Sequence, residues 1–457
     1  MTVLPPVPEI EPGGVEALVL AEGHSLAEEA PNPATPYRRL MLALIASFGG
    51  GFIVNVVPVT LLLTLHLSSI AGKGATSAFS LVVGLAGFCG LIANPIAGRI
   101  SDRTTAAMGR RRIWILLGGV TGGLVLWTMA FTTQVWQVAL VWCIVQVLIQ
   151  FQFASANAIV ADQVPVDRRG STSGAVGMIA AIAPVIGLGM VSAVSGSKGL
   201  QWTIVAVAGI VGAVISVMLL KDPQHVRREG APALNLKELA GSFWLSPRRH
   251  PAFAWAWVVR FLVTCTYASA AYLAFLLIDR FGMTEAEVSK TVVGLTVTNI
   301  AFVATCCGLG GWLSDRLKRQ KPFVIGGGIV AALGLAIMAF AQTIPMVYLG
   351  VSVLGLGYGF FLATDFALCI RMLPDPENIG KDFAVLGIAG SLPASFVPLM
   401  APLLLALGGY TALYLGIAIL GLLGVLAVLR IPEIGHEGDP RWAQITVADS
   451  VNEPVRA

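Results

Sequence analysis

Four side chains able to bind a ligand lie on one face of a long apolar segment, residues 135–160. Gln146, Gln150, Phe153 and Asn157 are spaced i, i+4, i+7 and i+11, which places them on one side of a helix. Amides both donate and accept hydrogen bonds, so with an aromatic ring among them they suit a polyhydroxylated molecule. The alternative is hydrogen bonding between helices, a common use of such residues inside helical bundles.

One acidic residue, Asp365, lies well inside another apolar segment, 345–370, with Tyr358 on the same helical face. A charge placed at such a position in a membrane costs about 2.5–3.5 kcal/mol on insertion scales. We predict that Asp365 carries a proton or binds a substrate. The alternative is a structural ion pair with Arg371 or an arginine in a loop.

Two further segments contribute polar candidates. In 252–278, Tyr267 lies deep in the segment, whereas Arg260 lies only about nine residues in, and we expect its long side chain to extend to the aqueous surface. In 38–66, Asn55 lies one turn before Pro58, and the proline leaves a backbone carbonyl without its helical partner. Asn55 therefore either faces a ligand or forms a hydrogen bond with the backbone carbonyl that the kink leaves without a partner.

A short phrase, G-x-x-S-D-R, occurs twice, at 98–103 and 311–316, 213 residues apart (315 minus 102). Each copy ends an apolar segment and precedes a basic cluster. The segments 151–165 and 360–374 are also similar to each other. Aligned in register, they share Phe, Ala, a hydroxyl residue, Ala and Pro. Two similarities in the same order predict a duplicated unit.

The elements that position these residues are membrane helices. Apolar residues make up 56% and charged residues 12% of the chain, whereas soluble domains carry about 25% charged residues. Segments of about 20 apolar residues can each span a bilayer. We predict an all-α integral membrane fold with twelve transmembrane helices in two pseudo-symmetric six-helix bundles. The predicted spans are 38–66, 77–98, 113–132, 135–160, 173–196, 201–220, 252–278, 288–313, 323–342, 345–370, 383–407 and 410–430.

Charge in the loops predicts topology. Lys and Arg concentrate in alternate loops, which by the positive-inside rule places both termini in the cytosol of a multi-pass cell-membrane protein. The predicted organisation is a disordered cytosolic tail (1–36), a bundle (37–220), a cytosolic linker (221–250), a second bundle (251–432) and a tail (433–457).

Several functions are disfavoured by what the sequence lacks. The six cysteines show no metal-binding spacing, and there is neither a phosphate-binding loop nor a nucleophile elbow. The basic clusters are short and lie between apolar segments, so they do not indicate nucleic-acid binding. We therefore expect no cofactor, no metal and no enzymatic activity.

The chain resembles the major facilitator superfamily in its layout of six plus six helices and in the repeated loop phrase G-x-x-S-D-R. The segment 101–112 is similar to the S-D-R…G-R-R-R loop of glycoside and sucrose cation symporters, and 373–382 to a segment of bacterial sugar-transporter-like members. Unlike those symporters, helices 1 and 2 carry no acidic residue within the membrane. In this superfamily helices 1, 4, 7 and 10 line the cavity, which implies that the polar candidates above face the substrate.

The resemblance also implies a cytosolic gate built on the two loop phrases, with Asp162 as a partner of Arg103 or Arg110; the alternative is simple anchoring of topology. The implied gate residues are Gly98, Asp102, Arg103, Gly109, Arg110, Arg111, Asp162, Gly311, Asp315 and Arg316.

The function expected from residues and resemblance together is secondary active transport by alternating access, as proton-coupled symport of a sugar or glycoside. The expected partners are a small-molecule substrate, a proton or another cation, and the lipid bilayer, and we expect a monomer. One alternative is a proton-coupled efflux antiporter of drugs or metabolites, which would favour a more apolar cavity. A second alternative is a non-transporting membrane sensor or a membrane enzyme.

Overall fold

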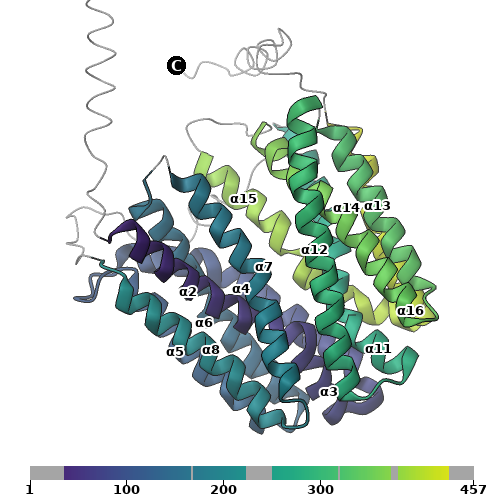
Figure 1. The fold of residues 1–457 in the computed structure, drawn as a ribbon, viewed down its shortest axis with the longest axis horizontal. Helices are drawn as coiled ribbons and strands as arrows, with labels where there is room; N and C mark the ends of the chain where they lie inside the picture. Colours follow the sequence, from purple (N-terminus) through teal and green to yellow (C-terminus); the bar gives the residue numbers. More distant parts are fainter. Residues whose placement is uncertain (1–34, 166–167, 223–249, 318–319, 372–378, 432–457) are drawn as a thin grey trace, which may run out of the picture.

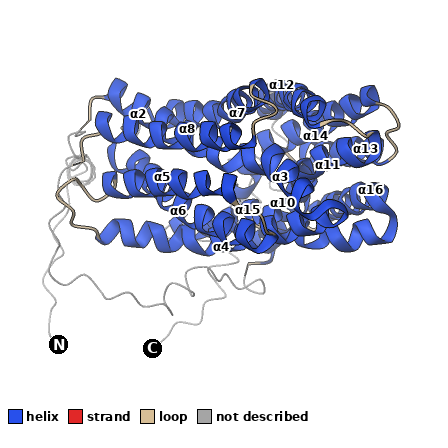
Figure 2. Cartoon of the chain, turned by 90° about the horizontal axis from the view of Figure 1, so that it is seen from below, coloured by secondary structure: helices blue, strands red, loops and turns tan. Residues whose placement is uncertain are grey.

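A computed structural model describes residues 35–165, 168–222, 250–317, 320–371 and 379–431, and these ranges contain helices and loops without any strand (Figures 1 and 2). The predicted tails and central linker fall almost entirely outside these ranges. The N-terminal half consists of α2 (Tyr37–Val57), η1 (Pro58–Leu62), α3 (Leu63–Ala71), η2 (Gly72–Gly74), α4 (Ala75–Arg103), α5 (Arg112–Trp127), η3 (Thr128–Phe131), α6 (Val135–Gln163), α7 (Arg169–Ala193) and α8 (Lys198–Leu219). The C-terminal half consists of α10 (Pro251–Ala268), η5 (Ser269–Tyr272), α11 (Leu273–Phe281), α12 (Glu285–Leu317), α13 (Lys321–Ala339), α14 (Ile344–Arg371), α15 (Ile379–Ser391) and α16 (Pro393–Val428).

Ten continuous helical stretches in the described ranges are long and apolar enough to cross a membrane. Two of them are long enough for two crossings each: Tyr37–Arg103 has 67 residues and Val385–Val428 has 44. The first changes direction at Gly72, with φ +53°, and the second at Gly409, with φ +60°, a conformation that glycine adopts without a steric penalty. The twelve predicted crossings are therefore confirmed.

The first helix of each half is interrupted near the same depth. Pro58 has no N–H to donate, and the backbone continues as a π-helical turn in which the Leu63 N–H donates to the Pro58 carbonyl. The Thr60 hydroxyl donates to the Val56 carbonyl within this turn (2.8 Å). The equivalent helix of the C-terminal half becomes a 3₁₀ turn at η5. The sequence predicts the irregularity at Pro58 but not its π-helical form.

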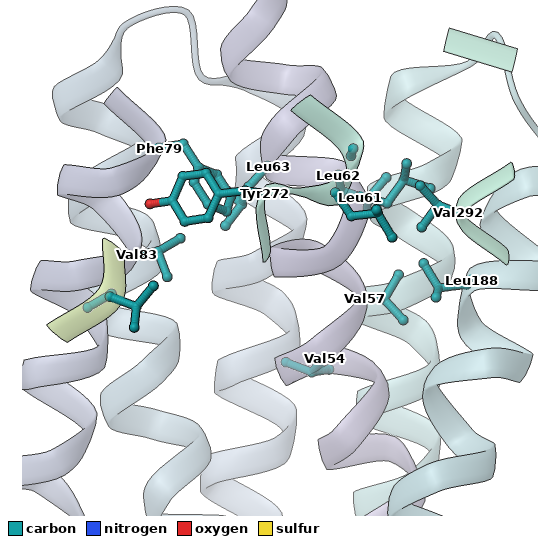
Figure 3. Close-up of a cluster of buried hydrophobic side chains, with 14 of the residues drawn as sticks. Val54, Val57, Leu61, Leu62, Leu63, Phe79, Val83, Leu188, Tyr272 and Val292 are labelled. Carbon is teal, nitrogen blue, oxygen red and sulfur yellow. The ribbon is translucent and has the colours of Figure 1, made fainter. Parts of the chain in front are cut away.

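The two halves are joined at one end of the molecule, here called the joined end. A single buried core contains Leu61, Phe79 and Leu188 from the N-terminal half together with Tyr272 and Val292 from the C-terminal half (Figure 3). All five side chains are fully buried. The joined end is thus closed by tightly packed apolar side chains contributed by both halves.

Helix α4 shows that the halves separate away from the joined end. Built Cβ atoms at Gly84 and Gly87 would meet Leu399 and Ser395 of α16 at 2.7 and 2.3 Å, so only glycine lets these two helices approach so closely. Eleven residues further along α4, about 16 Å away, no described residue lies within 4 Å of a Cβ at Gly98. The end that holds Gly98 is called the motif end below, and the ribbons of α7 and α12 lie farther apart there than at the joined end (Figure 1).

Candidate functional site

Helices α10 and α14 meet along a polar seam in the C-terminal half. Arg260 Nη1 lies 2.7 Å from Asp365 Oδ2, and the Asp365 side chain is only 4% exposed against 21% for Arg260. Seven residues away on each helix, Tyr267 and Tyr358 stack with ring centroids 4.2 Å apart and planes 11° from parallel. This set, Arg260, Tyr267, Tyr358 and Asp365, is called the charged seam.

The charged seam corrects the expectation for Arg260. Its side chain does not extend to the aqueous surface but turns to Asp365 on the neighbouring helix. Both residues lie at similar depth, about 13 Å from the start of α10 and about 9 Å from the end of α14, so the carboxylate is within reach. A structural partner for Asp365 was expected in Arg371, whose side chain lies outside the described part, or in a loop arginine; the structure shows an ion pair with Arg260 of α10.

Helices α2 and α6 meet along the corresponding seam of the N-terminal half. Gln146 Nε2 donates to Asn55 Oδ1 at 3.4 Å, which brings together two of the predicted substrate-binding residues. Seven residues away on each helix, Phe48 and Phe153 stack with centroids 6.0 Å apart. Gln146 Oε1 is buried without a hydrogen-bond partner among the described residues. This set, Phe48, Asn55, Gln146 and Phe153, is called the neutral seam.

The two seams occupy equivalent positions in the two halves. Every member of the charged seam lies 212 residues after a member of the neutral seam (260 minus 48, 267 minus 55, 358 minus 146, 365 minus 153). This separation is one less than that of the repeated loop phrase. The Arg260–Asp365 ion pair therefore stands where the N-terminal half has a phenylalanine pair, and the tyrosine stack stands where it has Asn55 and Gln146.

The remaining predicted substrate residues are separated in the structure. Gln150 accepts a hydrogen bond from Asn94 of α4 at 2.7 Å, and Asn157 is exposed near the end of α6. Phe153 is buried and also packs against Phe52, with centroids 5.2 Å apart. Phe153 thus belongs to an aromatic cluster, while Gln146 and Gln150 turn to different neighbouring helices.

At the motif end, Arg111 is the centre of an ionic network. Its buried guanidinium contacts Asp102 at 2.5 Å and Asp162 at 3.2 Å, and it donates to the Ser101 hydroxyl at 3.1 Å. Arg110 adds a second contact to Asp162 at 2.9 Å. The predicted pairing of Asp162 with Arg110 is confirmed, and these contacts join α4, the start of α5 and α6.

Asp222 completes this network and was not identified from the sequence. Its carboxylate accepts from the backbone N–H groups of Arg111 and Arg112 at 2.7 and 3.2 Å, at the start of α5. A carboxylate there offsets the positive end of the helix dipole. Gly109, with φ +101°, allows the loop to reach Asp222, because a Cβ would lie 2.5 Å from the Asp222 carbonyl oxygen. Two features of the sequence could have indicated this contact: Asp222 is an acid just after a helix, and Gly109 precedes a basic cluster.

The second copy of the phrase lies at the end of α12. Arg316 stacks over the Trp312 ring at 5.6 Å, and Ser314 is buried. No described residue lies within 4 Å of a Cβ at Gly311. The Asp315 side chain lies outside the described part, and Arg103 is exposed. In this conformation the ion pairs given for the first copy all stay within the N-terminal half.

These features describe a helical membrane protein of two six-helix halves that pack together at the joined end. The chain belongs to the Major Facilitator Superfamily, whose family model matches residues 40–398. It is a multi-pass membrane protein of this superfamily, and membership gives no support to the alternative of a membrane enzyme.

Solved structures of similar fold include the nucleoside transporter NupG, with a TM-score of 0.67 at 14% identity over 86% of this chain and 99% of that one. A peptide transporter POT in complex with sulfate gives a TM-score of 0.66 at 14% identity, covering 87% and 96%. A bacterial homologue of the human lysosomal transporter Spinster, in an inward-facing and unoccupied conformation, gives 0.62 at 16% identity, covering 91% and 98%. At such identities the likeness is one of fold alone.

Among curated proteins, the chain is similar to dipeptide and tripeptide permease A of Proteus mirabilis, with 33% identity over 22% of this chain and 20% of that protein. The corresponding permease of Erwinia pyrifoliae is 28% identical over 34% of this chain and 31% of that protein. The matched stretches thus span between a fifth and a third of these relatives. These relatives are named for peptides, so they give no support to the sugar branch that the loops resemble.

Proposed function

We propose that this protein couples the movement of a small polar solute to a proton by alternating access, with Asp365 as the proton carrier. The Arg260–Asp365 ion pair carries this proposal. Burial of such a pair is expensive, and an apolar pair of similar volume is often as stable or more so. The equivalent position of the other half is filled by Phe48 and Phe153. Because the fold does not need charges there, the pair is best explained by transport.

The substrate proposed first is a sugar or glycoside, bound between the seams by amides and tyrosines. The loop 101–112 resembles those of sugar cation symporters, and the Asn55–Gln146 pair offers neutral hydrogen-bonding groups. The peptide permease relatives favour a second candidate, a short peptide. The efflux antiporter is less favoured, because amides rather than apolar side chains occupy the neutral seam.

The two ends of the molecule are proposed as alternately opening gates. The positive loops support a cytosolic position for the motif end, so this conformation would be open to the cytosol and closed outside. Gly98 and Gly311, which no described residue approaches, are proposed as the surfaces that meet when the motif end closes. The proposed role of Asp102, Arg110, Arg111 and Asp162 is to hold these surfaces in place.

Transport in proteoliposomes with an imposed pH gradient tests the proposal, with sugars, glycosides, short peptides and cationic drugs offered in both directions. The wild type should accumulate one solute class when the pH gradient is imposed and lose the accumulation with a protonophore. Asp365→Asn should abolish accumulation while leaving solute exchange. A matched control is Asp279→Asn, which removes the carboxylate that accepts from Tyr410 at the joined end. Accumulation by Asp365→Asn that equals the wild type at every pH contradicts the proposal.

A further inference from the structure

Helix α4 carries an amide side chain, Asn94, that lies within the membrane and was not among the predicted substrate residues. Its Nδ2 donates to Oε1 of Gln150 on α6 at 2.7 Å, and Asn94 is an exposed residue. It lies nine residues, about 13 Å, before the end of α4. Polar side chains at such a depth almost always face the bundle interior or a water-filled cavity. The direction in which Asn94 points therefore decides what it can contact.

One side of α4 faces lipid, and Asn94 lies opposite that side. Large exposed apolar side chains of α4 share one helical face, at spacings of i, i+4, i+7 and i+11: Leu81, Leu85, Phe88 and Ile92. Successive residues are rotated by about 100° around a helix. Asn94, two residues after Ile92, is therefore rotated by about 160° from it and points away from the lipid.

Asn94 points between α6 and the C-terminal half. A Cβ at Gly90 would lie 3.3 Å from Gln150 Nε2 of α6, and a Cβ at Gly87 would lie 2.3 Å from Ser395 Oγ of α16. Asn94 is rotated by about 40° from Gly90 and by about 20° from Gly87, so its direction falls between these two. The amide can thus bond to Gln150 and still expose a side to the other half.

The space on this side of α4 widens toward the motif end. Gly87 lies close to α16, and Asn94 lies about 10 Å further along α4. Gly98 follows after about another 6 Å, and no described residue lies within 4 Å of a Cβ there. Asn94 is therefore placed where the described helices of the two halves part, on a surface that a solute between them would touch.

Asn94 and Gln150, called the amide pair, present one hydrogen-bond acceptor and one donor that the pair itself does not use. The bond between them engages Asn94 Nδ2 and Gln150 Oε1. Asn94 Oδ1 and Gln150 Nε2 have no partner among the described residues, and Nε2, unlike Gln146 Oε1, is not fully buried. Reversing both amides exchanges the atoms but leaves the same pattern. Neighbouring hydroxyl groups of a sugar match this pattern, because a hydroxyl both donates and accepts.

We propose that the amide pair is a sugar-binding subsite, in which one hydroxyl of the solute donates to Asn94 and the neighbouring hydroxyl accepts from Gln150. The inference deepens the proposed function, because it rests on a hydroxylated solute that moves between the halves and adds a contact on α4, which belongs to neither seam. The pair contains no ionisable group, so it favours an uncharged solute such as a glycoside. The charged termini of a short peptide gain nothing from it.

Cysteine labelling tests where Asn94 points. The variants Asn94→Cys and Ile92→Cys are made in the full chain with its six native cysteines replaced by alanine. A charged thiol reagent is then added to both sides of the membrane. Asn94→Cys should react at least tenfold faster than Ile92→Cys, because position 94 faces water between the halves and position 92 faces lipid. Equal rates, or faster reaction of Ile92→Cys, overturn the placement on which the inference rests.

Glycoside binding tests the chemistry of the pair. Methyl glucoside, methyl galactoside and sucrose are the probes, and alanylalanine is the peptide arm. Asn94→Leu removes the amide at nearly constant volume, and the melting temperature should change little because Asn94 is exposed. The affinity for the glycoside that binds best should fall about five- to tenfold, the value of one hydrogen bond. Ile92→Ala, on the opposite side of α4, should leave this affinity unchanged.

Deoxy analogues of that glycoside distinguish a direct contact from an indirect effect on the fold. An analogue that lacks the contacting hydroxyl should bind the wild type about five- to tenfold more weakly than the parent glycoside. The same analogue and the parent should bind Asn94→Leu equally, because the partner of that hydroxyl is gone. If every analogue loses as much affinity for the variant as for the wild type, Asn94 makes no contact with the solute and the inference is overturned.

The outcomes also separate the inference from the proposed function. Absence of binding of every glycoside overturns the inference, and accumulation of alanylalanine under a pH gradient would still support proton-coupled transport. Glycoside binding that depends on Asn94, without pH-driven flux of any solute, supports the amide pair and contradicts the proton-coupled function. Unchanged glycoside affinity of a folded Asn94→Leu protein overturns the inference.

Discussion

Replacing Tyr272 by phenylalanine should shift the protein away from the conformation described above. The Tyr272 hydroxyl lies 2.7 Å from the Ser80 hydroxyl, and this hydrogen bond crosses between the halves in the closed core of the joined end. Ser80 donates its own proton to the Thr76 carbonyl at 2.8 Å, so Tyr272 is the donor across the halves. The bond exists only while the joined end is closed, so its loss destabilises this conformation relative to any that is open there.

The size of the shift follows from the geometry. After Tyr272→Phe, Ser80 keeps its bond to the Thr76 carbonyl and no donor is stranded. The long 3.5 Å contact of the hydroxyl with the Pro398 carbonyl is also lost, but it lies within the C-terminal half. The loss across the halves is therefore the net value of one buried hydrogen bond, about 0.5–1.5 kcal/mol. At room temperature this changes the ratio of the two conformations by about two- to thirteenfold, with about fivefold expected for 1 kcal/mol. The ring remains and still packs edge-to-face against Phe79, with centroids 5.7 Å apart.

Spin labels at positions 198 and 285 can measure this ratio as a distance distribution. Lys198 and Glu285 are exposed, belong to different halves and lie 4.0 Å apart at the joined end. Tyr414→Phe is the matched control, since it removes a buried hydroxyl of the C-terminal half that has no partner among the described residues. The reasoning is refuted if Tyr272→Phe leaves the distribution unchanged, or if Tyr414→Phe shifts it equally.

Three further predictions concern the network and the seams. Gly109→Ala should lower the free energy of unfolding by about 1–3 kcal/mol, because the backbone of Gly109 has φ +101° and a Cβ would overlap Asp222. Thermal unfolding in detergent measures this loss. An unchanged melting temperature would contradict the geometry. Arg111→Gln should cost about 1–3 kcal/mol in the same assay, since Asp162 loses a charged donor. An equal loss from Arg39→Gln, an exposed arginine of α2, would contradict this reasoning. Gln146→Leu should change the melting temperature little, since it removes a buried amide oxygen without a described partner together with the long 3.4 Å bond to Asn55. It should raise KM for the transported solute, and an unaltered KM would exclude Gln146 from binding.

The sequence predicts the elements of this fold well because the membrane constrains them strongly. Segments of about 20 apolar residues must cross as helices, and charged loops mark their ends. The pairing of Asp162 with Arg110 was also foreseeable, since Asp162 lies in the last turn of α6 and Arg110 follows α4, which ends on the same side. These predictions need only position along the chain.

The partner of Asp365 was harder to predict, because it depends on how α10 and α14 are rotated about their own axes. Hydropathy does not report that rotation in a chain that is apolar almost everywhere. One signal was available, since the spacing of the repeated phrase relates Arg260 and Asp365 to residues near Phe48 and Phe153. The comparison shows a cation and an acid that both replace apolar residues, as expected of partners. The contribution of Asp222 depended on the path of a loop, and only its position after a helix and the glycine before the basic cluster pointed to it.

The distribution of charge also bears on how easily the two halves move. The Arg111 network ties helices within the N-terminal half, and the Arg260–Asp365 pair ties helices within the C-terminal half. Across the joined end the contacts given for the described residues are apolar packing, the bond between Ser80 and Tyr272, and one exposed ion pair at 4.0 Å, a kind worth about 0–1 kcal/mol. Strong interactions therefore make each half rigid, whereas weak ones hold the halves together. Because the interactions across the joined end are individually small, neutralising a single carboxylate and binding one solute can supply enough free energy to change which end is closed.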